Sequence, residues 1–330
     1  MDKDKIIIGD CIDGMRELPD GCVDLVIADP PYNMDKVREW DHMEADRYYE
    51  FCRDWIRECV RVLRPQGVMY IWHNDMAKFY RIIAMAEEAG CILESFCIWD
   101  KGNFRNTAWC GVNNSLRSWF NICEYVVHFV KGGRGSLPPT GLARVLSTPE
   151  CFRSLKDWYR KELERLGKTE RDLMAHYKAV TGRGDGMFRH YFKDTQFEIP
   201  TEAVYNAVFR PFGFVREYES LRAEYESLRE YHRTDEGHCN VFRHPAPAGC
   251  KKIHPTQKPE AILRRLIRVS CPPGGLVLDP FSGSGSTAAA AVLEGRHYIG
   301  FEKSQVYYDK SLAFIRRAAA EAAASSTARR

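Results

Sequence analysis

The sequence lacks any long apolar run, any paired-cysteine motif and any large excess of charge of one sign. No apolar run is long enough to cross a bilayer, and Met1–Lys5 leads straight into an expected strand, so we expect neither a membrane span nor a signal peptide. The 12 cysteines include no Cys-x-x-Cys pair, which favours reduced, mostly buried thiols over a disulfide framework, a metal site or a redox centre. These absences favour a cytoplasmic globular protein.

The formal net charge of +3 is close to neutral, so nucleic-acid binding would require a local basic surface. With 330 residues, 45% of them hydrophobic, the chain can form one large domain with an insertion or two modest domains.

Short apolar stretches alternate with amphipathic ones in both halves of the chain. This alternation predicts a mostly parallel sheet with helices on both faces. The strands are expected at residues 5–8, 23–28, 68–72, 91–99, 121–130, 276–278 and 298–302. The helices are expected at residues 12–18, 46–63, 76–89, 259–270, 288–293 and 307–323.

Between these halves the pattern changes. Residues 132–141 are rich in Gly, Pro and Ser and are typical of a linker. Residues 154–191, 202–208 and 216–231 are expected to be helical. The last range repeats Tyr-Glu-Ser-Leu-Arg after seven residues, which predicts one long amphipathic helix.

The stretch Asp29-Pro30-Pro31-Tyr32 directly follows the strand expected at 23–28. Two prolines fix φ and remove two backbone donors, so neither helix nor sheet can continue. The result is a rigid corner at the carboxyl end of a strand, where open α/β sheets bind ligands. It offers a carboxylate, a free carbonyl and an aromatic face, which suit a planar heterocycle with an exocyclic amino group.

A glycine-rich turn, Gly283-Ser284-Gly285, lies between an expected strand and an expected helix. Such a turn lets a ligand approach the backbone at a helix N-terminus. Glu302 ends the next strand, where its carboxylate could accept both hydroxyls of a ribose. Residues 283–288 also fit a loose dinucleotide fingerprint, so a nicotinamide enzyme must be considered, whereas no Lys follows the second glycine and a P-loop is excluded.

Three features decide between these nucleotide sites. Asp279-Pro280-Phe281 makes the glycine turn broader than a dinucleotide turn. The stretch His254–Pro259 carries a hydroxyl and an ammonium that could hold a small carboxylate. The Asp29–Tyr32 corner has no role in hydride transfer.

In this order, Asp-Pro-Pro-Tyr, His-Pro-Thr-Gln-Lys-Pro and Asp-Pro-Phe-Ser-Gly-Ser-Gly-Ser resemble the amino-group DNA methyltransferases that use S-adenosylmethionine, in their β arrangement. The match covers residues 5–131 and 251–317. It implies a permuted Rossmann-like sheet of seven strands, one of them antiparallel, with a mainly helical insert. The chain would divide into a catalytic half (1–131), a target-recognition region (132–250) and a cofactor-binding half (251–330).

The resemblance also implies the cofactor contacts. The methionine end of S-adenosylmethionine would contact the 279–285 loop and residues 256–258. Its ribose would contact Glu302, and its adenine would lie near Asp10-Cys11. Asp10 could instead cap the helix that follows it, and Lys258 could be a solvated surface lysine. The implied cofactor set is Asp10, Cys11, Thr256, Gln257, Lys258, Asp279, Phe281, Ser282, Gly283, Ser284, Gly285 and Glu302.

The implied catalytic residues are Asp29, Pro30, Pro31 and Tyr32, which would hold a base flipped out of a duplex. Asp as the first residue resembles the adenine-specific members, whereas the cytosine-specific ones usually carry Ser there. N4 of cytosine is therefore the rival target. A second rival to the proposed activity is a DNA-binding relative that has lost catalysis. For Tyr32 alone, the other interpretation is an aromatic side chain packed in the core.

The middle segment is locally basic with aromatics interleaved, as expected of phosphate contacts. Its basic residues include Arg153, Lys156, Arg160, Lys161, Arg165, Lys168, Arg171 and Lys178. Residues 170–177 and 187–192, with the turn 181–184, faintly resemble a helix-turn-helix; the alternative is an ordinary helical insert with a solvated charged face. The expected DNA contacts are Lys101, Asn103, Arg105, Arg171, Lys178, Arg183 and Arg189.

The expected partner is double-stranded DNA. The resemblance adds a homodimer and a cognate restriction enzyme, in a prokaryotic or phage-encoded setting.

Overall fold

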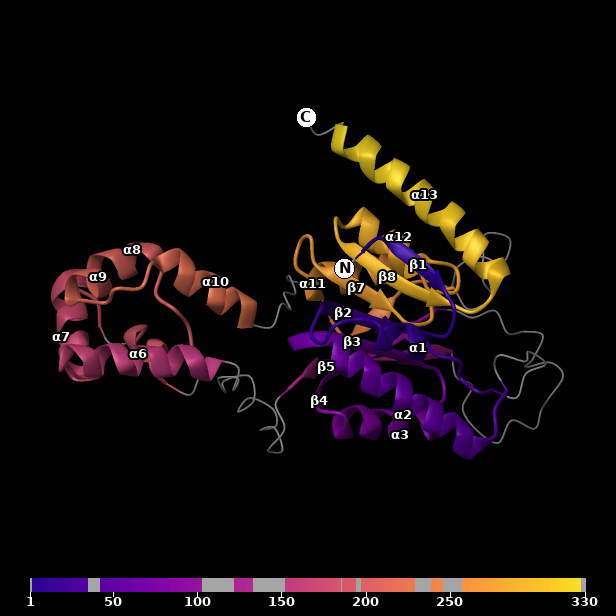
Figure 1. Cartoon of the computed structure of the whole chain (residues 1–330), viewed down its shortest axis with the longest axis horizontal. Coiled ribbons are helices and arrows are strands. Elements are labelled where there is room, and N and C mark those ends of the chain that lie inside the picture. The colour runs from indigo at the N-terminus through magenta and orange to yellow at the C-terminus, as the bar shows by residue number, and fades with distance from the viewer. Residues whose placement is uncertain are drawn as a thin grey trace. The chain divides into compact units, whose positions relative to one another are not determined.

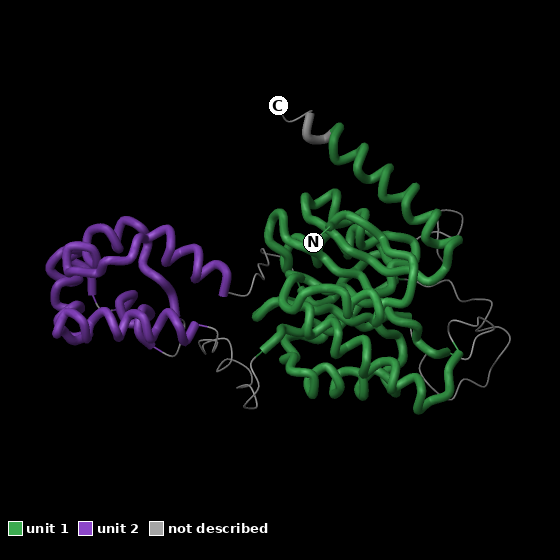
Figure 2. Tube along the Cα trace, in the orientation of Figure 1, with its two compact units in different colours: residues 1–132, 230–330 green, residues 133–229 purple. Residues whose placement is uncertain are grey.

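A computed structural model describes residues 2–34, 42–102, 122–132, 152–184, 186–193, 197–228, 239–245 and 257–327. The chain divides into two compact units (Figure 2). One comprises residues 1–132 and 230–330, and the other residues 133–229.

The larger unit is built on a mostly parallel sheet of eight strands within the described residues. The strand order is β1-β8-β7-β2-β3-β5-β4-β6, and β5 alone among these runs antiparallel to its neighbours. The strands are β1 (Lys5–Ile8), β2 (Val23–Ala28), β3 (Leu63–His73), β4 (Cys91–Asp100), β5 (Cys123–Lys131), β6 (Val241–Arg243), β7 (Leu276–Asp279) and β8 (His297–Glu302). The predicted mixed sheet with one antiparallel strand is confirmed.

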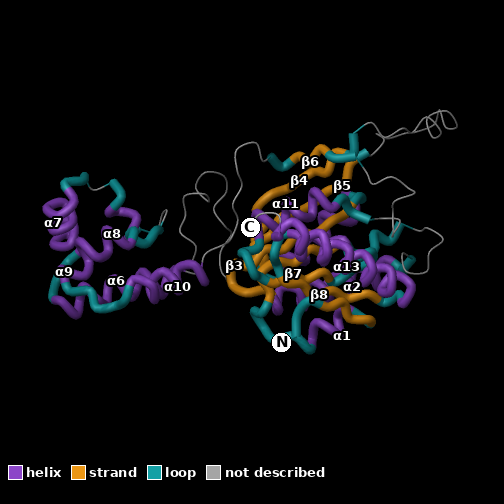
Figure 3. The backbone as a smooth tube through the Cα atoms, turned by 90° about the horizontal axis from the view of Figure 1, so that it is seen from above, coloured by secondary structure: helices purple, strands orange, loops and turns teal. Residues whose placement is uncertain are grey.

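The expectation of seven strands is wrong, because the described residues include an eighth strand, β6. It lies at the sheet edge (Figure 3) and pairs in parallel with β4, with Ile98 opposite Val241. Only Phe242 of its three residues is buried. So short a strand with one buried side chain leaves no alternating pattern in the sequence, and its residues fall in the range expected for the insert.

Helices cover both faces of this sheet, with α2 and α3 on one and α11, α12 and α13 on the other (Figure 1). Successive residues of β2 alternate between the two cores: Val26 and Ala28 face the first, Leu25 and Ile27 the second. The helices are α1 (Cys11–Arg16), α2 (Ala45–Val62), α3 (Met76–Glu88), α11 (Glu260–Ser270), α12 (Ser286–Leu293) and α13 (Gln305–Thr327).

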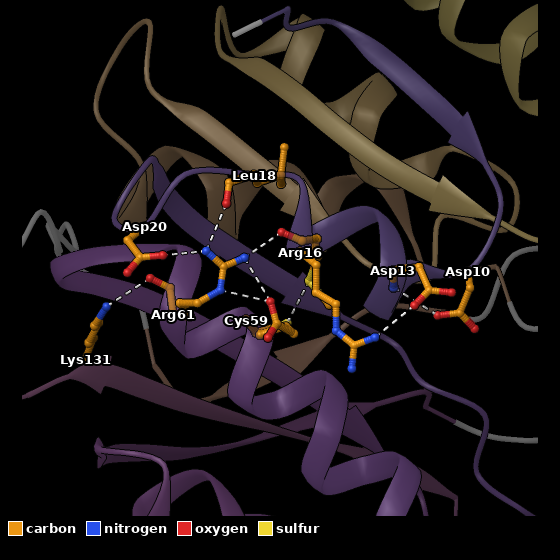
Figure 4. Close-up of polar contacts among 10 residues, drawn as sticks. Asp10, Asp13, Arg16, Leu18, Asp20, Cys59, Arg61 and Lys131 are labelled. Atoms are coloured by element: carbon orange, nitrogen blue, oxygen red, sulfur yellow. Dashed lines mark hydrogen bonds and ion pairs between the residues drawn. The ribbon is translucent and has the colours of Figure 1, made fainter.

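One arginine joins several segments at the edge where the parallel strands begin (Figure 4). The guanidinium of Arg61, at the end of α2, donates to the carbonyl oxygens of Met15 (2.6 Å) and Leu18 (2.9 Å). It also forms an ion pair with Asp20 at 2.5 Å. The ammonium of Lys131 donates to the Arg61 carbonyl at 3.3 Å. These bonds fix α1, α2 and the turn before β2 to one another.

The smaller unit is helical with its own aromatic-rich core, which includes Tyr159, Phe188, Phe209 and Phe214. A capping box between Thr169 and Asp172 begins α7, and Gly182 ends it in the left-handed region. Its elements are α6 (Arg153–Leu166), α7 (Glu170–Thr181), a 3-10 helix (Phe188–Tyr191), α8 (Glu202–Val204), a short π-helix (Tyr205–Phe209), α9 (Arg210–Phe212) and α10 (Tyr218–Leu228).

Two expectations for this unit are wrong. The second helix of the helix-turn-helix is only the four-residue 3-10 helix, because Phe188 and Tyr191 eclipse one another and both enter the core. The helix expected from residue 216 begins at Tyr218, because the Arg216 carbonyl accepts the Tyr205 hydroxyl at 2.6 Å. Residues 229–231, the rest of that expected helix, lie outside the described residues.

Candidate active site

The carboxyl edge of the sheet gathers the charged residues of the site and one histidine. In strand order from β1 to β4 it carries Asp10, Glu302, Asp279, Asp29, His73, Glu124 and Lys101. Glu124 belongs there because antiparallel β5 begins where its parallel neighbours end. Strands β2 and β7 are neighbours, with Leu25 opposite Val277 and Val26 opposite Leu278. Two stretches far apart in the sequence therefore end side by side.

The Asp29-Pro30-Pro31-Tyr32 corner is tied to the sheet by a directed chain of hydrogen bonds. The Asp75 amide donates to Nδ1 of His73 (2.9 Å), so the proton of the neutral ring is on Nε2. Nε2 lies 3.2 Å from the Tyr48 hydroxyl, which in turn donates to the Pro31 carbonyl at 3.0 Å. Burial lowers the pKa of His73 to about 4, which keeps this chain in one direction at neutral pH.

Tyr32 itself is 8% exposed and lies between His73 and Asp29. Its ring is 4.6 Å from the His73 ring, centroid to centroid, and its hydroxyl donates to Oδ1 of Asp29 at 2.8 Å. Tyr32 is thus packed, as the alternative interpretation held, but its polar end faces the motif carboxylate.

Lys258 reaches the same carboxylate from the other half of the sequence. Its Nζ donates to Oδ2 of Asp29 at 2.5 Å and lies 3.3 Å from Oε2 of Glu124. The opposite oxygen of Glu124 accepts from Lys101 at 2.7 Å. The Lys258 side chain is 4% exposed, so the interpretation as a solvated surface lysine is wrong.

The pKa values of these groups follow from burial and from one another. Loss of solvent raises the pKa of Asp29; the Lys258 ammonium opposes this rise, and Glu124 adds to it. Burial would also raise the pKa of Glu124, but the two lysines outweigh it and the pKa falls. Burial would lower the pKa of Lys258, yet its two carboxylates raise it above the usual value. The two lysines thus favour the ionised form of Glu124, whereas at Asp29 the effect of burial outweighs that of Lys258.

The glycine turn lies against Glu302. Gly283 and Gly285 have φ of 49° and 74°, and a Cβ on Gly285 would come within 2.9 Å of Ser311. The Gly283 amide donates to one oxygen of Glu302 at 2.8 Å, and the Ser304 amide donates to the other at 2.7 Å. Burial raises the pKa of Glu302. Backbone donors thus orient a carboxylate at the mouth of the turn.

Two buried polar groups of this loop suit a polar ligand. Burial raises the pKa of Asp279 to about 7, although Thr287 and the Phe281 amide donate to it. Among the described residues, Ser282 Oγ is buried without a hydrogen-bond partner. A polar ligand or a water molecule could supply the missing partner. Ser284 is buried beside it. Phe281 packs edge-on against Trp55 of α2, with centroids 5.4 Å apart.

Asp10 has the capping role that was the alternative interpretation: its Oδ1 accepts from the Ile12 amide at 2.7 Å. Its other oxygen forms an ion pair with Lys303 at 2.6 Å. Burial raises the pKa of Cys11 to about 12, so that thiol is not a nucleophile.

The expected DNA contacts fall into two groups. Arg171, Lys178, Arg183 and Arg189 are exposed on the smaller unit, with Arg171 and Lys178 two turns apart on α7. Lys101 is paired with Glu124 and its ammonium lies 4.9 Å from the Trp99 ring centroid. Lys156, also expected on the basic surface, is 8% exposed because it follows Leu155 on the buried face of α6. Asn103, Arg105 and Thr256 lie outside the described residues; Gln257 is half-buried.

Sequence reasoning missed Glu124, His73 and Tyr48. For Glu124 the signal is an acid at the start of an apolar strand, but it points to this edge only once β5 is known to run antiparallel. His73 closes an apolar strand, and Tyr48 looks like an ordinary buried position on α2.

Within the described ranges no group of three or more metal-binding side chains occurs, and none of the helices there has the length and apolar character of a bilayer span. The fold and the site define an open α/β protein in which a glycine turn and an acidic corner share one sheet edge. The sequence profile of the N6/N4 DNA methylase family matches residues 23–313. This chain therefore belongs to the DNA methylase family.

Individual proteins agree with this membership. The Type II methyltransferase M.HinfI of Haemophilus influenzae is 25% identical over 324 residues, covering 92% of this chain and 66% of the relative. M.HpaI of Haemophilus parainfluenzae is 24% identical over 308 residues, covering 92% and 72%. This chain thus spans about two thirds of the length of M.HinfI. The solved PvuII DNA methyltransferase, described as cytosine-N4-specific, matches in fold with a TM-score of 0.55 at 17% identity, covering 96% of this chain and 86% of that one.

Proposed function

We propose that the chain is a site-specific DNA methyltransferase that transfers a methyl group from S-adenosylmethionine to the exocyclic N6 of an adenine in DNA. Family membership supports the reaction class. The observation that carries the proposal is the pairing of β2 with β7, because it sets the Asp29 carboxylate beside the loop that begins at Asp279.

When bound, S-adenosylmethionine supplies a methyl group on a positively charged sulfur. The residues at hand fit its polar groups. Asp279 and the orphaned Ser282 hydroxyl would bind the methionine end. The resemblance adds Thr256, Gln257 and Lys258 to this end, although the Lys258 ammonium itself contacts Asp29. Glu302 keeps lone pairs for the ribose hydroxyls, and the Gly283–Gly285 backbone permits close approach. Asp10 and Cys11 would border the adenine.

The target base must leave the duplex, at a cost of a few kcal/mol of unstacking. Tyr32 would stack on it, a contact worth about 1–3 kcal/mol. Asp29 and the Pro30 carbonyl would accept hydrogen bonds from the two N–H groups of its amino nitrogen. These hydrogen bonds would draw the nitrogen lone pair out of conjugation with the ring and direct it at the methyl carbon. The methyl group would pass to this nitrogen as its bond to sulfur breaks, and the electron pair of that bond would stay on sulfur. Asp29 takes the surplus amino proton, directly or through water.

Adenine is preferred to cytosine as the target because the motif begins with Asp29, whereas Ser usually begins it in cytosine-specific members. The family profile covers both chemistries, so N4 of cytosine is the rival target.

Target recognition is assigned to residues 132–250, between the catalytic half 1–131 and the cofactor half 251–330. Exposed Arg171, Lys178, Arg183 and Arg189 support this assignment, because exposed cations bind phosphates and fix the register on a duplex. Lys101, Asn103 and Arg105, which follow β4 in the sequence, would add further DNA contacts. By analogy with the Type II relatives, we extend the proposal to a homodimer that acts beside a cognate restriction enzyme. The setting would be a bacterial cytoplasm or a phage.

The purified protein should be incubated with isotope-labelled S-adenosylmethionine and DNA of mixed sequence, followed by nucleoside analysis. Label in N6-methyl-2′-deoxyadenosine is the expected result. Label in N4-methyl-2′-deoxycytidine would show that cytosine is the target base, and DNA binding without label would overturn the enzymatic proposal. Sequencing the methylated positions in a host that expresses the chain would then give the recognition site.

A further inference from the structure

The ammonium of Lys258 is buried beside the carboxylate that is proposed to hold the target base. It contacts Oδ2 of Asp29 at 2.5 Å and Oε2 of Glu124 at 3.3 Å. It also lies 5.4 Å from the Tyr32 ring centroid and 5.3 Å from that of Trp72. A cation beside two aromatic faces and between two carboxylates is strongly held.

The same surroundings are what an exocyclic amino group needs. The amino nitrogen must donate to Asp29 and lie by the ring of Tyr32, and Lys258 already donates to Asp29 near that ring. Both donors therefore compete for one carboxylate. Oδ1 of Asp29 already accepts from Tyr32 and Oδ2 from Lys258, so a base that binds Asp29 must share an oxygen with one of these donors or displace it.

Glu124 offers the place to which the ammonium can retreat. Its Oε2 is already 3.3 Å from Nζ of Lys258. The Glu124 side chain is only 12% exposed, so this second contact is shielded from bulk water. Lys101 holds the other oxygen at 2.7 Å and fixes the carboxylate in place. The four groups balance in charge, two anions against two cations, which allows the contact to shift without creating an unpaired buried charge.

We propose that Lys258 occupies the amino-group subsite on Asp29 until the target base enters, and that Glu124 then retains its ammonium. Glu124 and Lys258 are thus positioning residues that act on the catalytic carboxylate. This inference rests on the proposed function, because it names the control of the same site.

The charged and titratable groups that face Asp29 are Lys258, Glu124, Tyr32 and, across β7, Asp279. Lys101 and His73 face Glu124. Lys258 lowers the pKa of Asp29 and Glu124 raises it. Removal of Lys258 must therefore raise the pKa of Asp29, whereas removal of Glu124 must lower it.

The test is the pH dependence of kcat/KM for DNA at saturating S-adenosylmethionine, which holds Asp279 ionised. In Lys258→Gln the acidic limb is expected to move to higher pH, because Asp29 loses its cation. In Glu124→Gln it is expected to move to lower pH. Glu124→Gln should also raise KM for DNA roughly tenfold, the effect of one charge-assisted hydrogen bond, with kcat less affected, because Lys258 then stays on Asp29.

Two matched controls lie at the opposite edge of the sheet. Glu294→Gln removes a largely buried acid that pairs with Arg264 and Arg268, and Lys131→Gln removes an ammonium that donates to the Leu63 carbonyl. Neither should move the limb. A loss of activity in Lys258→Gln and Glu124→Gln with the limb unmoved, or moved in the same direction in both, would overturn the inference while leaving the methyltransferase intact. No methylation by the unaltered protein would instead overturn the proposed function.

Discussion

The two edges of the sheet both carry carboxylates that are largely withdrawn from water, but their chemistry differs. At the amino edge Glu294 pairs with two arginines, and these outweigh the effect of burial and lower its pKa. At the carboxyl edge two lysines likewise lower the pKa of Glu124, but burial prevails at Asp29, Asp279 and Glu302 and raises the pKa of each. Glu294 is satisfied within the chain and stabilises it. Asp29 accepts from Lys258 and Tyr32, and Glu302 accepts from two backbone amides, but these donors do not offset the loss of water around the carboxylates. Carboxyl groups whose pKa is raised by burial in this way are typical of binding and catalytic sites.

The largest expected effect is at the corner motif. Asp29→Ala should reduce turnover by more than about a thousandfold, because it removes an acceptor that acts on the reacting nitrogen. Cofactor affinity, measured by calorimetry, should be largely retained. The matched change Asp20→Ala at the amino edge, which removes a partner of Arg61, should leave turnover nearly unchanged. Unchanged turnover in Asp29→Ala would refute its role.

Asp279→Asn should stabilise the cofactor-free protein. The pKa of Asp279 is raised from 3.8 to about 7, so its favourable contribution is present below pH 3.8 and lost as the pH rises to 7. At pH 8 the folded state thus carries a penalty of up to about 4 kcal/mol, which Asn removes. The measurement is urea unfolding at pH 5 and 8; an Asn variant less stable at pH 8 would contradict the account.

The same residue gives a binding prediction. Because ionised Asp279 is proposed to bind the methionine ammonium, S-adenosylmethionine affinity should rise by roughly tenfold between pH 6 and pH 8. Asp279→Asn should bind weakly and without this pH dependence. Calorimetry at three pH values is sufficient, and a pH-independent affinity in the unaltered protein would exclude Asp279 from the contact.

Glu294→Gln tests the other edge. Its pKa is lowered, so its contribution is present above pH 4.5 and lost as the pH falls through the folded value. The change should cost about 1–3 kcal/mol of unfolding free energy at pH 7, since two guanidinium groups lose a charged partner. Turnover should persist. A Glu294→Gln variant that is stable but inactive would contradict the assignment of stability to the amino edge and activity to the carboxyl edge.

The smallest expected effect is that of Tyr48→Phe, which removes the hydroxyl that donates to Pro31 and keeps the ring. The change breaks the hydrogen bonds of this buried side chain with the Pro31 carbonyl and with Nε2 of His73, so we expect a loss of about 1–3 kcal/mol in unfolding free energy. The loosened corner should lower kcat roughly fivefold, the equivalent of about 1 kcal/mol. The matched control is Tyr49→Phe at the next position of α2, which should have no effect on turnover. Equal losses in the two variants would remove the Tyr48 hydroxyl from the account of the corner.

The sequence was sufficient for what depends on local pattern. The strand before Asp29, the helix at 45–62 and the glycine turn all follow from periodicity and from Pro and Gly. The pairing of β2 with β7 agrees with the resemblance, but the residues alone do not specify it. Glu124 and β6 could not be found, because their positions depend on strand direction and on a partner strand far away in the chain.

The most direct test of the central claim is a crystal structure of the chain with S-adenosylhomocysteine. We predict the sulfur at the carboxyl edge, between the Gly283–Gly285 turn and the Asp29–Tyr32 corner, with Asp279 and Glu302 in contact with the ligand. A ligand bound at the amino edge, or with its sulfur turned away from Asp29, would contradict this claim.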